Sequence, residues 1–268
     1  MTNFEAVFLG ILQGVTEFLP VSSSGHLILA EHFMGLSDVP LAFDVTLHLG
    51  TLLAVLGFFY RDWMDMLLSL FSKAGNRAAD RRLFMYIMAG TIPGAVVGYL
   101  LEDIVSSVLR SPWVVVFTLS AVALLLALAE RMASNRKKVS DMRLMDALVV
   151  GTCQALAVVP GTSRSGITMT GAMFLGFSRA EAARFSFLLS APIIAGAGLY
   201  EVKKLFETGG TVPGVEYFTG FVAAAVSGYA VIAFLMHYLR RHTFYPFVIY
   251  RLVLAAVVAS ALLLGGQT

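Results

Sequence analysis

The chain has 268 residues, of which 58% are hydrophobic and only 13% carry a charge. Soluble domains contain roughly 25% charged residues, so this composition, with a mean hydropathy of +0.80, excludes an ordinary soluble protein. The net charge of +2 is small. The basic residues gather at the ends of apolar segments, so nucleic acid is not an expected partner. We therefore expect residues 1–268 to form one all-α membrane domain in contact with membrane lipid.

The first apolar segment is broken. Its arms, residues 4–19 and 27–35, are each too short to cross a bilayer, and the first contains polar Gln13 and Glu17. Small polar residues fill the break at 20–26. Short apolar arms around a polar break are typical of a re-entrant hairpin, whose irregular backbone must be enclosed by protein or line a water-filled cavity.

Six longer apolar segments each approach the roughly 20 residues that a membrane-spanning helix needs. The predicted spans are Phe43–Tyr60, Leu83–Leu101, Trp113–Glu130, Ala182–Glu201, Tyr217–Leu239 and Tyr245–Leu264. A second broken segment lies between the third and fourth spans. Its arms, Leu144–Val159 and Gly166–Gly176, flank another polar run, so a second re-entrant hairpin is predicted there.

The two broken segments correspond residue by residue when 141 is added to the first. The matches include Gly10 with Gly151, Gln13 with Gln154, Ser22 with Ser163, Ser24 with Ser165, and Gly25 with Gly166. Matches at one ungapped offset indicate an internal duplication, with repeat 1 at about residues 1–140 and repeat 2 at about 141–268. Each repeat is a hairpin plus three spans. A re-entrant hairpin returns to the side of the membrane that it entered, whereas three spans end on the opposite side. The second repeat therefore starts on the other side and is predicted to be inverted relative to the first.

Loop charges agree with an inverted repeat. Most lysines and arginines fall in segments 61–82 and 131–143, at Arg179 and Arg184, or at 240–241, all on one side of the predicted topology. The positive-inside rule makes that side cytoplasmic. The two hairpins then enter from opposite faces, and their polar tips meet near the midplane. The positive N-termini of the helices that follow the breaks would share one anion there.

Two charged residues inside the broken segments are the most informative, because a charge at membrane depth is costly without a partner. Arg164 would clamp phosphate oxygens with its planar guanidinium, or form a structural ion pair. Glu17 and the amide oxygen of Gln13 would hold Mg²⁺ or Ca²⁺, or Glu17 would pair with Arg164. The two interpretations of Glu17 are compatible, and both stay open.

Hydroxyl groups and a histidine surround these charges. Ser163, Ser165 and Thr168 would donate hydrogen bonds to a phosphate, or cap the helix that follows. His26 would act as a nucleophile or a general acid–base group, or only bond polar backbone. The grouping of hydroxyls around Arg164 favours a phosphate site. Asp44, His48 and Arg251 are less informative, because packing pairs or snorkelling explain them nearly as well as a cavity does.

Two motifs give the chain a family resemblance. Residues 12–26, LQGVTEFLPVSSSGH, resemble the first motif of bacterial undecaprenyl-pyrophosphate phosphatases, the bacitracin-resistance family. Residues 160–168, PGTSRSGIT, match the second motif of that family in full. Further similar runs at 185–189 and 247–251 extend the resemblance over essentially the whole chain.

The resemblance implies a multi-pass enzyme of the bacterial inner (cytoplasmic) membrane. Its substrate would be undecaprenyl pyrophosphate, and its products undecaprenyl phosphate and inorganic phosphate. This reaction would recycle the lipid carrier of cell-wall synthesis and confer bacitracin resistance. The resemblance further implies a divalent cation, an inverted-repeat fold and a site open to the periplasm. It leaves a homodimer open.

The motifs also assign roles by position. Glu17 matches the metal-linked acid of the family, and Arg164 matches the pyrophosphate-binding arginine. His26 and Ser23 match the residues proposed for catalysis, and we expect His26 rather than Ser23 to attack or to activate the attacking group. Gln13 stands where many relatives carry glutamate, so a cation held there would meet one negative charge fewer. The remaining predicted substrate-binding residues are Ser22, Ser24, Ser163, Ser165 and Thr168.

The alternative function is transport. Inverted repeats, broken helices and an anion site at the midplane are also features of transporters. Such a protein would carry an anion or flip the lipid phosphate from one leaflet to the other. A purely structural membrane scaffold does not explain Glu17 and Arg164.

Overall fold

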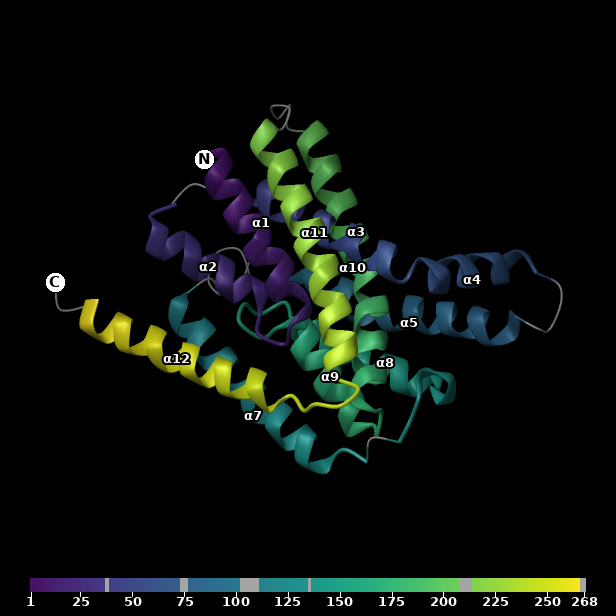
Figure 1. Cartoon of the computed structure of the whole chain (residues 1–268). Coiled ribbons are helices and arrows are strands. Elements are labelled where there is room, and N and C mark those ends of the chain that lie inside the picture. Colours follow the sequence, from purple (N-terminus) through teal and green to yellow (C-terminus); the bar gives the residue numbers. More distant parts are fainter. Residues whose placement is uncertain (37–38, 73–76, 102–110, 135, 208–213, 266–268) are drawn as a thin grey trace.

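The computed structural model describes residues 1–36, 39–72, 77–101, 111–134, 136–207 and 214–265, and these fold almost wholly into helices (Figure 1). Six of the described helices are long and apolar enough to cross a membrane. They are α3 (Leu41–Phe58), α5 (Ala78–Leu100), α7 (Pro112–Met132), α10 (Arg179–Glu207), α11 (Val215–Tyr238) and α12 (Tyr245–Gly265). The predicted all-α membrane fold is confirmed, and the chain is a multi-pass membrane protein.

Four shorter helices form the two predicted hairpins. The first pairs α1 (Asn3–Phe18) with α2 (Ser23–Met34), and the second pairs α8 (Leu144–Leu156) with α9 (Arg164–Phe174). Both α2 and α9 begin earlier than the apolar pattern predicts. The polar residues of each motif form the first helical turn, because a serine side chain caps the free N–H groups there.

The hairpins exchange partners between the two halves of the chain. Helix α1 packs along α11, and α8 packs along α5, so each hairpin contacts the middle span of the other proposed repeat (Figure 1). This exchange is what two related halves would produce. The inverted orientation of the repeats stays a prediction.

Glycines allow both of these helix pairs to approach closely. A Cβ atom at Gly151 of α8 would lie 2.1 Å from the carbonyl oxygen of Gly90 in α5. A Cβ atom at Gly10 of α1 would lie 2.4 Å from the carbonyl oxygen of Gly220 in α11. Neither contact tolerates a side chain. Because Gly10 and Gly151 are 141 residues apart, the same packing device serves both hairpins.

The segment at 61–82 differs from the prediction of a loop. Its first part is helix α4 (Tyr60–Phe71), which lies beside α5 and buries Met66 and Ser69 (Figure 1). The guanidinium of Arg184 in α10 contacts Asp62 of α4. Charged residues on one face of this short helix lowered its hydropathy, which explains why the apolar pattern missed it. A single 3₁₀ turn, η2 (Val139–Asp141), precedes α8.

The largest hydrophobic core cluster lies between the hairpins and the spans. Phe18 at the end of α1 packs edge-to-face on Phe187 of α10, with their ring centroids 5.3 Å apart. Met169 of α9 belongs to the same cluster and is fully buried. This core holds the end of α1 and the middle of α9 in one cluster, which helps to fix the position of the two breaks.

Candidate active site

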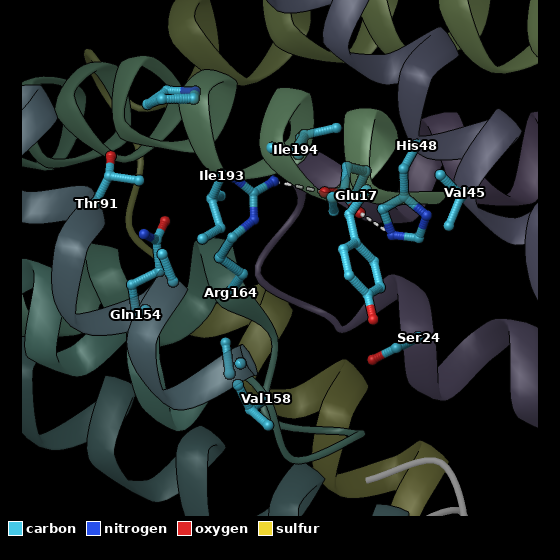
Figure 2. Close-up of a pocket in the computed structure, with 18 of the residues that line it drawn as sticks. Glu17, Ser24, Val45, His48, Thr91, Gln154, Val158, Arg164, Ile193 and Ile194 are labelled. Carbon is cyan, nitrogen blue, oxygen red and sulfur yellow. Dashed lines mark hydrogen bonds and ion pairs between the residues drawn. The ribbon is translucent and has the colours of Figure 1, made fainter. Parts of the chain in front are cut away.

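The two breaks open onto one cavity of about 620 Å³. Its polar lining comes from both hairpins and from α3, α5 and α10, and Figure 2 shows several of these side chains pointing into the same space. The side chains with polar groups that line it are Glu17, Ser23, Ser24, His48, Thr91, Tyr99, Gln154, Ser163, Arg164 and Tyr200. The prediction that Glu17 and Arg164, far apart in sequence, lie at one place is confirmed by their direct contact.

Glu17 is the centre of the polar network. Its Oε1 accepts a hydrogen bond from Arg164 Nη2 at 2.5 Å, across the interface between the hairpins. Its Oε2 accepts hydrogen bonds from Ser23 Oγ at 2.5 Å and from Gln13 Nε2 at 3.0 Å. The ion pair therefore exists, as one of the two interpretations of Glu17 predicted. The contact with Ser23 brings a hydroxyl group into direct reach of a carboxylate base.

His48 approaches the same carboxylate from α3. Its Nδ1 lies 2.7 Å from the carbonyl oxygen of Asp44. A carbonyl only accepts hydrogen bonds, so Nδ1 carries a proton. The other ring nitrogen, Nε2, faces Glu17 Oε2 at 3.7 Å. Sequence reasoning gave His48 little weight, because a four-residue spacing from Asp44 is equally typical of packing. Contact with an acid from another helix could not be inferred from that spacing.

Each break ends on a serine with a left-handed backbone. Ser22 has φ 78° and Ser163 has φ 69°, a conformation that residues other than glycine seldom adopt. Their side chains accept hydrogen bonds from the N–H groups of Gly25 at 3.3 Å and Gly166 at 3.1 Å. Strain of this kind, costing about 1–3 kcal/mol at each residue, is concentrated at functional sites. The two tips therefore have the same local geometry at positions 141 residues apart.

The predicted substrate-binding hydroxyls divide into two groups. Ser24 and Ser163 line the cavity, together with Arg164. Ser22, Ser165 and Thr168 are not among the described residues that line the cavity, and their hydroxyls bond other protein groups. Ser165 Oγ donates to the carbonyl of Leu19 at 3.0 Å, and Thr168 Oγ1 donates to the carbonyl of Arg164 at 2.7 Å. The capping role left open by the sequence belongs to Ser163, which caps α9 and also lines the cavity, while Ser165 and Thr168 bond backbone carbonyls near the breaks.

His26 lies away from the residues around Glu17. Its Nδ1 donates to the carbonyl of Ser22 at 2.7 Å, and its Nε2 lies 2.7 Å from the hydroxyl of Tyr250 in α12. Both ring nitrogens are thus engaged, and His26 is not among the described residues that line the cavity. This geometry favours the role of bonding polar backbone over the direct attack that we expected from the motif.

Arg251 connects the two breaks by hydrogen bonds to their backbone carbonyls. The side chain is fully buried, and its guanidinium donates only to backbone carbonyls. One acceptor, Pro20, lies in the first break, and two, Gly161 and Thr162, lie in the second, all at 3.0–3.2 Å. Two more, Thr118 and Leu119, lie in α7. Snorkelling is therefore the wrong interpretation of Arg251, whose guanidinium is enclosed by backbone carbonyl acceptors.

Two side chains that line the cavity, and Gln13 beside Glu17, have unused hydrogen-bonding groups. Within the described residues, Gln13 Oε1, Arg164 Nη1 and both amide atoms of Gln154 are buried without a partner. Buried polar atoms are rarely left unpaired unless a ligand or ordered water completes them. The sequence assigned no role to Gln154, although its correspondence with Gln13 was visible in the repeat.

The donor set fits a loosely held divalent cation. Across the described part of the chain, no group of three or more His, Cys, Asp or Glu side chains converges as a closed metal site would require. Glu17 offers a carboxylate, and the Gln13 amide, whose Nε2 bonds that carboxylate, keeps its oxygen Oε1 without a partner among the described residues. Mg²⁺ is commonly held by one or two protein oxygens, with water and substrate phosphate completing its coordination.

Comparisons with known proteins agree over the length of the chain. The pattern of the family described as "Bacitracin resistance protein BacA" matches residues 6–257. A protein of Desulforudis audaxviator, named undecaprenyl-diphosphatase, is 47% identical over 99% of this chain and 100% of its own length. Proteins of the same name from Moorella thermoacetica and Rubrobacter xylanophilus are 45% and 46% identical, over 97% of this chain and 98% of their own lengths. The chain belongs to the bacitracin resistance protein BacA family.

Proposed function

We propose that this protein is an undecaprenyl-diphosphatase, a membrane hydrolase that converts undecaprenyl diphosphate to undecaprenyl phosphate and inorganic phosphate. The single observation that carries the proposal is the contact between Ser23, Glu17 and Arg164 in one cavity. It combines a nucleophile (Ser23), a base (Glu17) and a guanidinium that binds phosphate (Arg164). The name shared by the relatives gives the substrate, which is a polyprenyl lipid. The product is a lipid carrier for cell-wall synthesis.

The first chemical step follows from the hydrogen bond between Ser23 and Glu17. The Ser23 hydroxyl transfers its proton to Glu17 Oε2, and its oxygen forms a bond to the terminal phosphorus. The bond between that phosphorus and the bridging oxygen breaks, and the electron pair leaves with undecaprenyl phosphate. Arg164 and the positive N-termini of α2 and α9 stabilise the charge on the phosphate oxygens during this transfer.

The second step returns the enzyme to its starting state. Water attacks the phosphorus of the phosphoserine and gives one proton to His48 Nε2, the bond between that phosphorus and Ser23 Oγ breaks, and Oγ takes back the proton held by Glu17 as inorganic phosphate leaves. Glu17 and His48 are the two groups placed for this transfer. We prefer Ser23 to His26 as the nucleophile because the ring nitrogens of His26 bond Ser22 and Tyr250.

A divalent cation would be held by Glu17 and Gln13 and would supply positive charge to the diphosphate oxygens when bound. Adding excess chelator to the purified enzyme is expected to reduce phosphate release by about 10-fold or more, because one of the charges that offset the diphosphate is lost. Restoring Mg²⁺ or Ca²⁺ is expected to recover the rate. Undiminished turnover in chelator would remove the cation from the proposal.

The orientation of the site is a proposal from the loop charges. We place the segment at 131–143 in the cytoplasm of a bacterial cell, and the cavity open to the periplasmic side of the inner membrane. The lipid tail would then lie along apolar surface. Of the described cavity-lining residues, many are apolar, among them Val45, Ile193 and Ile194 (Figure 2).

The competing function is a transporter for an anion or a lipid phosphate. One assay separates the two, in which purified protein in detergent micelles is given undecaprenyl diphosphate and phosphate release is measured. An enzyme releases phosphate without a sealed compartment, whereas a pure transporter leaves the diphosphate intact. No release above a protein-free control would contradict the proposed function.

A further inference from the structure

Gln154 is a buried cavity residue that the mechanism above does not use. Its side chain is only 4% exposed, and it lines the cavity from α8. In the part of the chain that the structure describes, neither Nε2 nor Oε1 has a hydrogen-bond partner. Leaving both ends of a buried amide unpaired is costly. A polar side chain in this state therefore indicates a ligand that bonds it.

The other repeat explains why this amide is unpaired. Gln13 occupies the equivalent position in α1, and its Nε2 donates to Glu17 four residues later. The residue four positions after Gln154 is Val158, whose side chain offers no acceptor and which lines the same cavity. The two glutamines, at equivalent positions of the two proposed repeats, thus differ in their hydrogen bonding. One is occupied by the acid, and the other is left with its hydrogen-bonding groups unused.

Close packing holds the amide in place. A Cβ atom built on Gly94 of α5 would lie only 3.2 Å from Gln154 Nε2. The amide therefore rests against the helix at a position where glycine leaves it room. A side chain packed in this way is preorganised, and little conformational entropy is lost when it binds a ligand.

Arg164 lies between Glu17 and Gln154 in the cavity. Figure 2 shows its guanidinium with Glu17 on one side and Gln154 on the other. Nη2 bonds Glu17, while Nη1 is buried and has no partner among the described residues. Since Ser23 bonds Glu17, the terminal phosphate lies on that side. The phosphate that remains with the lipid then lies toward Gln154.

We propose that Gln154 is a substrate-binding residue, whose Nε2 donates a hydrogen bond to the lipid-linked phosphate of the diphosphate, next to Arg164 Nη1. The proposal rests on the proposed function for the identity of the substrate. It adds a consequence for recognition, because a ligand with a single phosphate held at Ser23 does not reach Gln154. The amide therefore favours a diphosphate over a monophosphate.

Two variants and one control test this role by kinetics in detergent. Gln154→Met keeps the length of the side chain and removes both polar atoms, and Gln154→Glu replaces the donor by a negative charge. Thr152→Val is the control, since Thr152 is exposed on the same helix and bonds only the carbonyl of Leu148. We expect the KM for undecaprenyl diphosphate to rise about 10-fold in Gln154→Met and further in Gln154→Glu, with kcat changed less than about 3-fold. The control is expected to match the wild type.

Thermal unfolding supplies a readout that does not depend on turnover. Without ligand, Gln154→Met is expected to unfold at the wild-type temperature or above it, because an unpaired buried amide is removed. Inorganic pyrophosphate is expected to raise the unfolding temperature of the wild type but not of Gln154→Met. Inorganic phosphate, which fits the Ser23 side alone, is expected to act equally on both.

An unchanged KM together with an unchanged pyrophosphate shift in Gln154→Met would overturn the inference. A wild type that releases no phosphate but is stabilised by pyrophosphate would contradict the proposed function alone, and the shift in Gln154→Met would still decide the role of Gln154. A wild type that neither releases phosphate nor responds to pyrophosphate would contradict both.

Discussion

At the scale of the residue, the site depends on a buried carboxylate whose two oxygens are both hydrogen-bonded. Glu17 is 5% exposed and bonds Arg164, Ser23 and Gln13. A buried carboxylate with a paired cation and additional donors is stable where an isolated one is not. The same contacts align the Ser23 hydroxyl with Glu17. The hydrogen bonds that stabilise the buried carboxylate therefore also position it to accept the proton of Ser23.

Arg251 has the complementary task of holding the backbone. Replacing it by leucine leaves carbonyls of Pro20, Gly161 and Thr162 buried without a donor. We expect Arg251→Leu to lower the free energy of unfolding by about 3 kcal/mol or more, since unsatisfied buried acceptors are among the costliest single changes. Denaturant unfolding of the purified protein in detergent measures this.

Arg240→Ala is the matched control for that experiment, because Arg240 is exposed at the end of α11. It is expected to unfold as the wild type does, within about 0.5 kcal/mol. Equal stability of Arg251→Leu and the control would show that the two breaks do not need this arginine.

At the scale of the element, the sequence predicted the helices better than it predicted their contacts. Apolar length was sufficient for the six spans, and the polar breaks at 20–26 and 160–168 were sufficient for two hairpins. Helix α4 was missed because its charged face hides a buried one. The positive φ of Ser22 and Ser163 was also out of reach, because serine gives no sign of it in a sequence.

Close helix contacts are the most sensitive feature at this scale. Gly151 of α8 faces the carbonyl of Gly90 in α5, and an added Cβ atom would lie 2.1 Å from that oxygen. We expect Gly151→Ala to force the two helices apart and to cost about 2 kcal/mol in the free energy of unfolding. Phosphate release is expected to fall as well, since α8 positions Gln154.

Gly57→Ala controls for the loss of a helical glycine as such. A Cβ atom there would meet Tyr229 at an ordinary 3.9 Å, and alanine favours the helix by up to about 1 kcal/mol. That variant is expected to be as stable as the wild type or more so. If Gly151→Ala behaves like Gly57→Ala, close contact between α5 and α8 is not needed.

At the scale of the whole molecule, the proposed duplication would explain how the polar residues of the cavity are divided between the two halves of the chain. Repeat 1 contributes Glu17 and Ser23, and repeat 2 contributes Arg164 and Gln154. The 141-residue offset made that division visible in the sequence. The sequence alone could not show which polar residues face the cavity, because His26 and Ser23 lie in the same motif and only tertiary packing separates them.

Inversion of the repeats predicts where the two hairpins begin. Asn3 starts the first and Ser140 precedes the second, and both side chains are exposed. In a Cys153→Ala background expressed in intact bacteria, Asn3→Cys is expected to react with a membrane-impermeant thiol reagent, whereas Ser140→Cys is expected to react only after the cells are opened. The reason is that positively charged segments stay in the cytoplasm.

Val215→Cys is the positive control, because the loop charges place the start of α11 on the periplasmic side. Labelling is read by mass shift of the purified protein. Equal labelling of Asn3→Cys and Ser140→Cys in intact cells would contradict the inverted arrangement without affecting the assignment of the active site.

The most direct test of the active site is phosphate release from undecaprenyl diphosphate by purified protein in detergent, compared among Ser23→Ala, Glu17→Gln, Arg164→Gln and the wild type. Each variant removes one member of a single contact network drawn from both hairpins. We expect each to lose about 1,000-fold or more in kcat/KM, because groups that act as a unit fail together. Ser260→Ala, exposed on α12, is expected to retain full activity. Turnover near the wild-type rate in any of the three variants, with the protein still folded, would contradict the account.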